Sequence, residues 1–185
     1  FTHEQNEPVT DVPFLDALAW CNALSEMEGR EPCYYVDAEK TEVFRFRSIA
    51  TRATWPKGRE AGENPIYEPA ELPTIYVRWE ADGYRLPTPA EWSAAASKNL
   101  SVDPEHAWTR GNSGGRTHPV GTTRAGANGL YDMAGNVAEL AWNFSDAYEG
   151  GSPPDIVALG GDFAYPKTVE AVGPSGPASL AGHSG

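Results

Sequence analysis

Glycine and proline are spread so densely along this chain that few segments can form long helices or strands. The 185 residues include 19 glycines and 16 prolines, and both residue types disfavour the interior of regular elements. After Asn99 the apolar residues occur only in short groups between Gly, Asn, Pro and Asp. The sequence therefore predicts a loop-rich fold without a helix after residue 99.

Two segments before that point carry helix signals. Over residues 12–28 the apolar residues recur at helical spacing, with Thr10 or Asp11 available as the N-cap and Gly29 as a C-terminal stop. The segment 88–91, Thr-Pro-Ala-Glu, is a capping box with proline at the first helical position. We predict a long first helix and a second helix that begins at this box.

Short strands are predicted on either side of a long irregular segment. The β-prone run at 33–36 and the alternating pattern at 74–79 are typical of strands. Residues 45–73 mix Arg, Pro, Gly and Glu without a period, which indicates an excursion with at most local structure. Because 40% of the residues are apolar, a chain of this length can bury one core. We therefore expect a single domain.

The charge balance excludes one class of partner. Asp and Glu number 26 against 14 Lys and Arg, for a formal net charge of −12, and such an excess of acid disfavours binding to nucleic acid. No apolar run approaches the roughly 18 residues of a membrane span, so we expect no transmembrane helix. The chain starts at Phe1 and shows no leader segment, and we expect it to be part of something longer.

The two cysteines, Cys21 and Cys33, lie twelve residues apart. No third cysteine and no histidine pattern completes a zinc-binding spacing with them. Two arrangements fit this pair: a disulfide between the two cysteines, or two separate buried thiols. The sequence leaves this choice open.

Residues 129–140 place two carboxylates, Asp132 and Glu139, around small turn residues. Backbone carbonyl groups between them can converge with both side chains on one hard cation, and an oxygen-only ligand set suits Ca²⁺. The alternative is structural: Asp132 caps a turn, Asn136 closes an Asx turn, and Glu139 is solvated or paired with an arginine. The spacing alone permits either interpretation.

Three motifs in order make the chain resemble the formylglycine-generating-enzyme-like domain, or sulfatase-modifying factor domain. They are Asp-Ala-Leu-Ala-Trp-Cys-Asn at 16–22, Gly-Tyr-Arg-Leu-Pro-Thr-Pro-Ala-Glu-Trp at 83–92, and the segment 129–139; Gly-Gly-Asp-Phe at 160–163 resembles a later strand motif. The resemblance implies an α+β, C-type-lectin-like fold with two helices packed on small antiparallel sheets. It also implies that residues 1–185 form one domain that lacks the family's N-terminal strand region and its last strand.

The family binds a structural Ca²⁺ through the segment that 129–139 resembles. The resemblance assigns the ligands to two side chains and two backbone carbonyls, those of Asp132, Glu139, Gly135 and Val137. All four positions are chemically competent for Ca²⁺. Two tryptophans of the family pattern are replaced here by Ala138 and Leu140, which removes aromatic surface without touching a ligand.

The enzymes of this family bind copper through two cysteines that follow the Gly-Gly strand motif. Tyr165 and Glu170 hold those positions here, and neither a phenol nor a carboxylate replaces the soft thiolate that Cu(I) requires. We therefore expect no catalytic residues and no formylglycine generation. The alternative is an oxidoreductase of the same family with a site free of cysteine, for which Tyr165, Glu170 and His183 offer polar groups.

Other members without catalytic residues display a ligand-binding surface, among them variable proteins diversified by retroelements. Residues 162–184 lack the arginines and paired aromatics that the family carries there, which suits either a diversified surface or an ordinary loop. We predict a non-catalytic domain that binds an unknown protein or glycan ligand at a bacterial cell surface or after secretion. The predicted ligand contacts are Trp142, Phe144, Tyr148, Asp162, Ala164, Tyr165, Lys167, Ser175, Ser179 and His183. Core packing is the alternative for the aromatic side chains among these contacts and for Phe163.

Overall fold

The computed structural model describes residues 6–45, 52–54, 66–68, 72–97, 101, 103–149 and 157–164. The chain divides into two compact units, each assembled from separated stretches. The first unit holds Phe1–Ala17, Arg85–Phe144 and Asp155–Gly185, and the second holds Leu18–Tyr84 and Ser145–Pro154. The expectation of one incomplete domain over residues 1–185 stays a prediction.

Two helices and small antiparallel sheets make the fold α+β, as the sequence predicts. Helix α1 (Phe14–Met27) confirms the predicted first helix. Gly29 follows it with φ +71°, the left-handed conformation in which helices commonly stop at glycine. Neither helix within the described ranges is long and apolar enough to cross a membrane.

The start of α1 differs from the prediction. The carbonyl of Pro13 accepts a hydrogen bond from the Ala17 amide at 3.1 Å, which is the first backbone bond of the helix. Thr10 and Asp11 therefore lie before the helix and do not cap it. Asp11 adopts φ +57° in that preceding segment, a conformation that aspartate tolerates better than most residues. The sequence contains residues that commonly cap helices, but the helix predicted from it starts too early.

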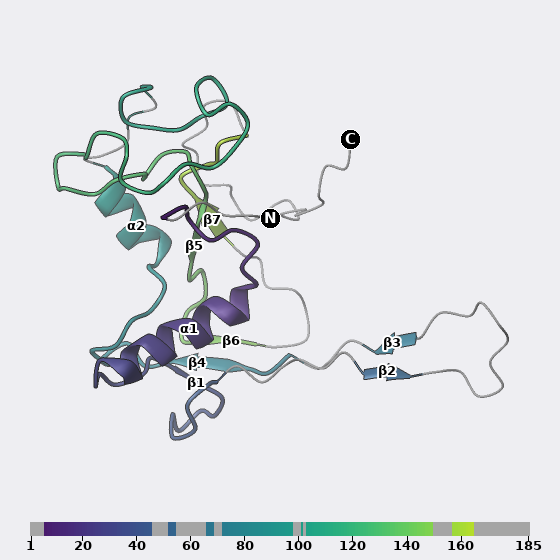
Figure 1. Cartoon of the computed structure of the whole chain (residues 1–185). Coiled ribbons are helices and arrows are strands. Elements are labelled where there is room, and N and C mark those ends of the chain that lie inside the picture. The colour runs from purple at the N-terminus through teal and green to yellow at the C-terminus, as the bar shows by residue number, and fades with distance from the viewer. Residues whose placement is uncertain are drawn as a thin grey trace, which may run out of the picture. The chain divides into compact units, whose positions relative to one another are not determined.

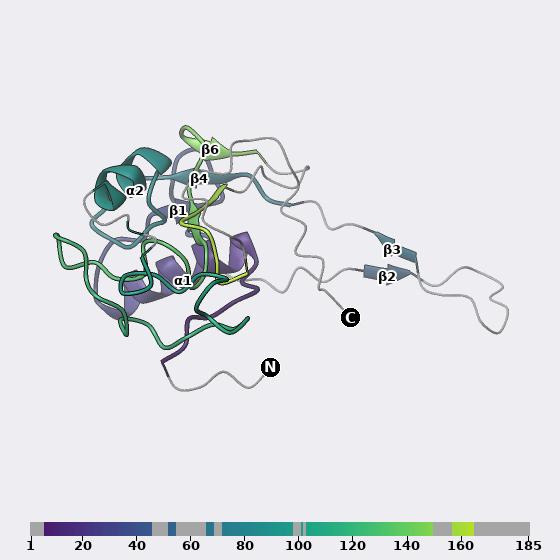
Figure 2. The ribbon, with the colours of Figure 1, turned by 90° about the horizontal axis from the view of Figure 1, so that it is seen from above.

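A three-stranded antiparallel sheet lies beside α1 in the second unit (Figures 1 and 2). Its order is β1 (Tyr34–Tyr35), β4 (Ile75–Val77) and β6 (Ala147–Tyr148). Tyr34 pairs with Val77, and Ile75 pairs with Tyr148; all four side chains are buried. Strands β1 and β4 confirm the two predicted strands, in shorter form.

Asn22 ties α1 to this sheet through four backbone hydrogen bonds. Its Nδ2 donates to the carbonyls of Tyr34 and Phe44, each at 2.8 Å. Its Oδ1 accepts from the amides of Cys33 at 3.1 Å and Tyr34 at 3.0 Å. The carboxamide is buried and has every donor and two acceptor positions satisfied. This explains physically why an asparagine ends the first family motif.

The turn that precedes the second motif packs against the end of α1. The Ser25 hydroxyl accepts from the Tyr84 amide at 2.7 Å and donates to the Cys21 carbonyl at 2.7 Å. A Cβ at Gly83 would lie 2.1 Å from the Glu31 carbonyl oxygen, which is far inside van der Waals contact. Glycine is therefore required at position 83 for this close approach.

Strands β2 (Arg52–Thr54) and β3 (Ile66–Glu68) pair antiparallel within the segment predicted as a long excursion. Arg52 lies opposite Glu68, and Thr54 lies opposite Ile66. This pairing is the local structure that the sequence allowed for between residues 45 and 73.

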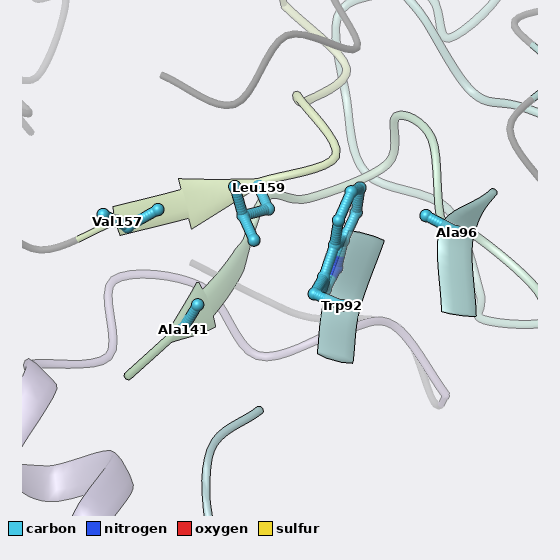
Figure 3. Packing of buried hydrophobic residues seen from close by; sticks show 5 residues of the cluster. All are labelled: Trp92, Ala96, Ala141, Val157 and Leu159. Carbon is cyan, nitrogen blue, oxygen red and sulfur yellow. The ribbon is translucent and has the colours of Figure 1, made fainter. Parts of the chain in front are cut away.

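The first unit packs helix α2 (Pro89–Ala96) against a two-stranded antiparallel sheet of β5 (Glu139–Ala141) and β7 (Val157–Leu159). Five buried side chains form its apolar cluster, with Met133 packed against it: Trp92, Ala96, Ala141, Val157 and Leu159. Figure 3 shows the Trp92 ring facing Leu159, with Ala141 and Val157 on the neighbouring strands. Burial of these side chains holds α2 and the strands together.

The predicted capping box at the start of α2 is confirmed. The Thr88 hydroxyl accepts from the Glu91 amide at 3.2 Å, and Glu91 Oε2 accepts from the Thr88 amide at 2.8 Å. Arg85 adds two parallel hydrogen bonds to the same carboxylate, at 2.8 and 2.7 Å. The Arg85 guanidinium lowers the pKa of Glu91 to about 2, with the Thr88 amide contributing further.

Glu91→Gln is expected to weaken the first unit only where wild-type Glu91 is ionised. Because the folded pKa of about 2 lies below the ordinary value of 4.5, the stabilisation is present above pH 4.5 and is lost as the pH falls toward 2. The side chain is half exposed, so the loss near neutral pH should be at most about 1 kcal/mol. Urea unfolding of wild type and variant across this pH range measures the difference.

Glu149→Gln is the matched control for that series, since Glu149 is exposed and forms no ion pair within the described residues. It should change the free energy of unfolding little at any of these pH values. A Glu91→Gln effect that is the same at pH 3 and pH 7 would contradict the electrostatic origin of the stabilisation.

Candidate functional site

The predicted calcium segment is a series of turns with left-handed backbone conformations. Asp132, Gly135 and Asn136 have φ of +55°, +76° and +59°. Such values favour glycine, asparagine and aspartate over other residues. The segment leads directly into β5, which begins at Glu139.

Asn136 fixes this segment by its side chain and its backbone. Its Oδ1 accepts from the His118 amide and its Nδ2 donates to the His118 carbonyl, both at 3.0 Å. The Asn136 amide donates to the Trp108 carbonyl at 2.7 Å, and its carbonyl accepts from the Phe163 amide at 3.1 Å. Three distant stretches of chain therefore converge on one buried residue. The Asx turn that spacing suggested does not form, because the side chain bonds to His118.

Gly135 lies in backbone contact with Trp108. A Cβ at this position would be 2.2 Å from the Trp108 carbonyl oxygen, and the Gly135 amide donates to the Gly160 carbonyl at 2.9 Å. The Trp108 ring stacks on the His118 ring, with centroids 3.8 Å apart, so the two residues that the segment contacts also contact each other. Glycine at 135 thus allows the signature segment to approach its neighbours.

Glu139 carries a buried carboxylate oxygen that has no hydrogen-bond partner among the described residues. The Trp92 indole nitrogen is also buried and makes no hydrogen bond of good geometry among the described residues, although it lies near enough to the Glu139 carboxyl to affect its pKa. A Cβ on Gly160 would lie 2.5 Å from Glu139 Oε2, 3.1 Å from the Met133 carbonyl oxygen and 3.3 Å from the Trp92 ring. The absence of a side chain at Gly160 therefore leaves room beside this oxygen.

Burial is the main cause that raises the pKa of Glu139 to about 8; the Trp92 indole and the backbone of Glu139 itself offset part of the rise, and the charge of Asp132 adds a smaller part to it. The Asp132 carboxylate accepts from the Gly121 amide at 2.7 Å and from the Thr123 hydroxyl at 3.4 Å. Pairing of Glu139 with an arginine is wrong in this structure, because Glu139 forms no ion pair among the described residues. Full exposure to solvent is wrong as well, because the residue is half-buried and its Oε2 is buried.

The donor set fits a calcium ion. Ionising a buried carboxyl without a partner is costly, which is why the pKa of Glu139 is raised to about 8, and the negative charge of Asp132 adds a smaller cost. A divalent cation removes both costs and takes oxygen ligands of this type. The Asp132 oxygens already accept hydrogen bonds, but a carboxylate has further lone pairs available.

Of the four predicted ligands, Asp132 acts on Glu139 through its charge, and Gly135 is fixed next to β7 by its hydrogen bond to Gly160. Val137 is half-buried immediately before β5. No local sequence pattern connects Trp92 or Gly160 with this site, although each belongs to one of the family motifs.

The predicted ligand contacts divide into three groups. Trp142 and Tyr148 are buried, in the first and second unit respectively, so their rings serve packing here. Phe144 is half-buried against Trp142 at a centroid separation of 5.2 Å. Ala164 is exposed, and its amide donates to Asp162 Oδ1 at 2.7 Å in a tight turn. Tyr165, Lys167, Ser175, Ser179 and His183 lie outside the described residues.

Cys21 and Cys33 form no disulfide, and both are buried thiols. Burial, with a smaller contribution from the neighbouring Cys33, raises the pKa of Cys21 to about 11. Cys21 is therefore a neutral thiol at neutral pH, and neither cysteine is exposed. Tyr165 and Glu170, at the positions of the family's catalytic cysteines, lie outside the described residues, as does His183.

Comparison with known proteins agrees with this fold and these motifs. Residues 1–179 match the model of the sulfatase-modifying factor enzyme 1-like domain. The chain is 30% identical over 167 residues to "Chaperone protein LppX" of Paenibacillus barcinonensis, covering 76% of this chain and 53% of that protein. It thus spans about half the length of this curated relative.

Two solved structures share the fold. Treponema denticola variable protein 1 aligns with a TM-score of 0.61 and 28% identity, covering 91% of this chain and 64% of that one. CarF aligns with a TM-score of 0.60 and 25% identity, covering 90% and 60% respectively. The resemblance found in the sequence motifs is confirmed, and the chain belongs to the family of sulfatase-modifying factor enzyme 1-like domains.

Proposed function

We propose that this chain is a non-catalytic, calcium-stabilised domain that binds a protein or glycan ligand at a bacterial cell surface or after secretion. Two similarities support this proposal: one solved relative is named a variable protein, and a curated relative is named a chaperone. Diversification of residues 162–184 by a retroelement belongs to the same proposal. The surface would use Asp162, Ala164 and the residues that follow, and Phe144 where its ring is accessible.

The observation that carries the non-catalytic part is the state of the two thiols. The chain has only two cysteines, and both are buried on residues of the second unit. A copper site of the family type needs thiolates that the metal and oxygen can reach. Neither cysteine meets this requirement, and the positions that carry the enzymatic pair hold Tyr165 and Glu170.

Elemental analysis of the purified protein tests this part directly. We expect no stoichiometric copper or iron, and no oxygen consumption with a cysteine-containing peptide after incubation with Cu(I). Stoichiometric copper or iron, or oxygen uptake that depends on Tyr165, Glu170 or His183, would instead establish the oxidoreductase alternative.

The calcium part of the proposal rests on Asp132 and Glu139. Within this chain these two side chains would hold the ion, together with carbonyl oxygens of Gly135 and Val137. The ion would neutralise the buried Glu139 carboxylate and so stabilise the turn segment before β5. Its role in the proposal is structural.

Calcium is expected to raise the melting temperature of wild type and to have no such effect on Glu139→Gln. Saturation at about 100 times the dissociation constant is worth about 2.7 kcal/mol, which corresponds to roughly 5 to 10 °C for a chain of this size. Differential scanning calorimetry with Ca²⁺ and with chelator measures the shift.

Glu149→Gln, an exposed carboxylate in the second unit, serves as the control and should keep the full calcium response. An equal response in Glu139→Gln would refute the assignment of this residue as a ligand, and it would leave the ligand-binding part of the proposal intact.

A further inference from the structure

The dipeptide Asn-Gly occurs once in this chain, at residues 128–129, and it lies in an exposed turn of the first unit. The Gly129 amide donates to the Gly126 carbonyl at 3.0 Å, and the Gly126 amide donates to the Leu130 carbonyl at 2.8 Å. Gly129 has φ +79°, and a Cβ on it would have no neighbour within 4 Å. The backbone after Asn128 is therefore open to solvent and free of side-chain crowding.

The Asn128 carboxamide is folded toward this backbone. Its Oδ1 accepts a long hydrogen bond from the Leu130 amide, at 3.4 Å, and its Nδ2 donates to the Ala95 carbonyl at 3.1 Å. The first contact turns the carboxamide toward the peptide group between Gly129 and Leu130. A five-membered ring closes when the Gly129 nitrogen bonds to the Asn128 Cγ, and glycine hinders this approach least because it has no Cβ.

We propose that Asn128 deamidates spontaneously in the folded protein and is a site of self-modification. The Gly129 nitrogen loses its proton to water and bonds to the Asn128 Cγ. The bond from Cγ to Nδ2 then breaks, and the amide nitrogen takes up a proton from water and leaves as ammonia. A second water opens the succinimide at either of its carbonyls, which gives aspartate or isoaspartate at position 128. No electrons are transferred, and the inference does not depend on the proposed function.

The turn must open before the ring can close. The Gly129 amide is bonded to the Gly126 carbonyl, so its nitrogen becomes available only when this hydrogen bond breaks. No residue from 126 to 130 is buried, and exposed turns without buried side chains open locally at little cost in free energy. The hydrogen bond therefore slows the reaction without preventing it.

Three other asparagines show what sets Asn128 apart. Asn22 and Asn136 are buried, and their carboxamides are hydrogen-bonded. Asn143 is exposed, but the residue after it is Phe144, which is half-buried and carries a bulky side chain. Because exposure and a following glycine coincide only at Asn128, deamidation should be selective for this residue.

Conversion of Asn128 removes a contact to the end of α2. Ala95 is the last residue but one of this helix, and the last carbonyls of a helix have no partner within it. The Asn128 Nδ2 donates to the Ala95 carbonyl, whereas a carboxylate has no hydrogen to donate. The new negative charge also lies at the C-terminal end of α2, where the helix dipole disfavours it. Deamidation should therefore loosen the turn from α2.

Incubation of the whole folded chain at neutral and at mildly alkaline pH tests the reaction. Peptide mass spectrometry should detect aspartate and isoaspartate at position 128, and the rate should rise with pH because the attacking nitrogen must lose its proton. Conversion of Asn143 should be at least about tenfold slower, which corresponds to about 1.4 kcal/mol of activation free energy. Asn128→Gln, which requires a larger ring, and Gly129→Ala, which places a methyl group beside the attacking nitrogen, should each suppress the modification.

A matched pair of variants measures the consequence for stability. Asn128→Asp reproduces one product and should lower the melting temperature by about 2 to 4 °C. Asn143→Asp adds the same charge at an exposed position and should leave the melting temperature unchanged. Retention of the amide at position 128 in the folded chain, equal rates at Asn128 and Asn143, or conversion only in urea would each overturn the proposal. Equal melting temperatures of the two variants would overturn the effect on α2.

Discussion

Gly135→Ala is expected to destabilise the first unit by about 2 to 5 kcal/mol. The left-handed backbone at this position (φ +76°) costs a residue with a Cβ about 1–2 kcal/mol. The new methyl group would also lie 2.2 Å from the Trp108 carbonyl oxygen, and forced overpacking costs a further 1–3 kcal/mol or so. Thermal unfolding should show a decrease of roughly 5 to 15 °C.

Gly129→Ala separates the two causes. Gly129 has nearly the same backbone conformation, with φ +79°, but a Cβ there would have no neighbour within 4 Å. Gly129→Ala should therefore lower the free energy of unfolding only by the cost of the left-handed backbone, about 1–2 kcal/mol. If both variants lost the same stability, the close approach of Gly135 to Trp108 would have no energetic weight.

Asn22→Ala is expected to destabilise the second unit by about 3 to 5 kcal/mol. The substitution leaves the amides of Cys33 and Tyr34 and the carbonyls of Tyr34 and Phe44 without their side-chain partner in a buried site. Each unsatisfied buried group costs about 1–3 kcal/mol, and structural relaxation recovers part of the sum. Hydrogen exchange at Cys33 and Tyr34 should become faster, and this measurement is specific to the second unit.

Asn22→Asp is the informative companion variant. It keeps an acceptor for the two amides but removes both donations, and it places a charge in a buried position. We expect protection at Cys33 and Tyr34 to recover partly when the aspartate is neutral at low pH. Asn143→Ala, at an exposed position, should change neither stability nor exchange. Unchanged exchange in Asn22→Ala would contradict the role of Asn22 in joining α1 to the sheet.

The sequence predicts the end of a helix correctly where that end depends on residues close by in the chain. The capping box at Thr88 and Glu91 formed as expected because both partners lie within one helical turn. Gly29 ended α1 for a similar reason. The predicted start of α1 is too early. The sequence shows which residues are able to cap a helix, but it does not show that the first helical hydrogen bond is accepted by Pro13.

The residues that organise the calcium segment could be predicted only in part. The sequence predicts Asp132 and Glu139 as ligands because two carboxylates at that spacing are typical of a calcium-binding segment. Trp92 and Gly160 are more than 20 residues from Glu139 in sequence, so no local pattern connects them with it. The hydrogen bonds from the Asn136 side chain to His118 could not be predicted either, because the sequence shows that an asparagine is present but not which distant residue it contacts.

The aromatic residues illustrate a further limit. The sequence predicts Trp142 and Tyr148 as ligand contacts, with core packing as the alternative for both, and both are buried. Composition and spacing do not distinguish an aromatic anchor of a core from one of an interface, because both use the same large apolar side chains. Only the position of the neighbouring elements decides between them.

The interleaving of the two units limits how this protein can be divided by engineering. Each unit is discontinuous, and the chain passes from one to the other at Ala17, Tyr84, Phe144 and Pro154. A continuous fragment that retains the whole second unit must run from Leu18 to Pro154 and therefore includes Arg85–Phe144 of the first. Such a fragment lacks β7, which pairs with β5, and so exposes a strand edge that favours aggregation. Grafting or display of either unit therefore requires the whole chain or a circular rearrangement of it.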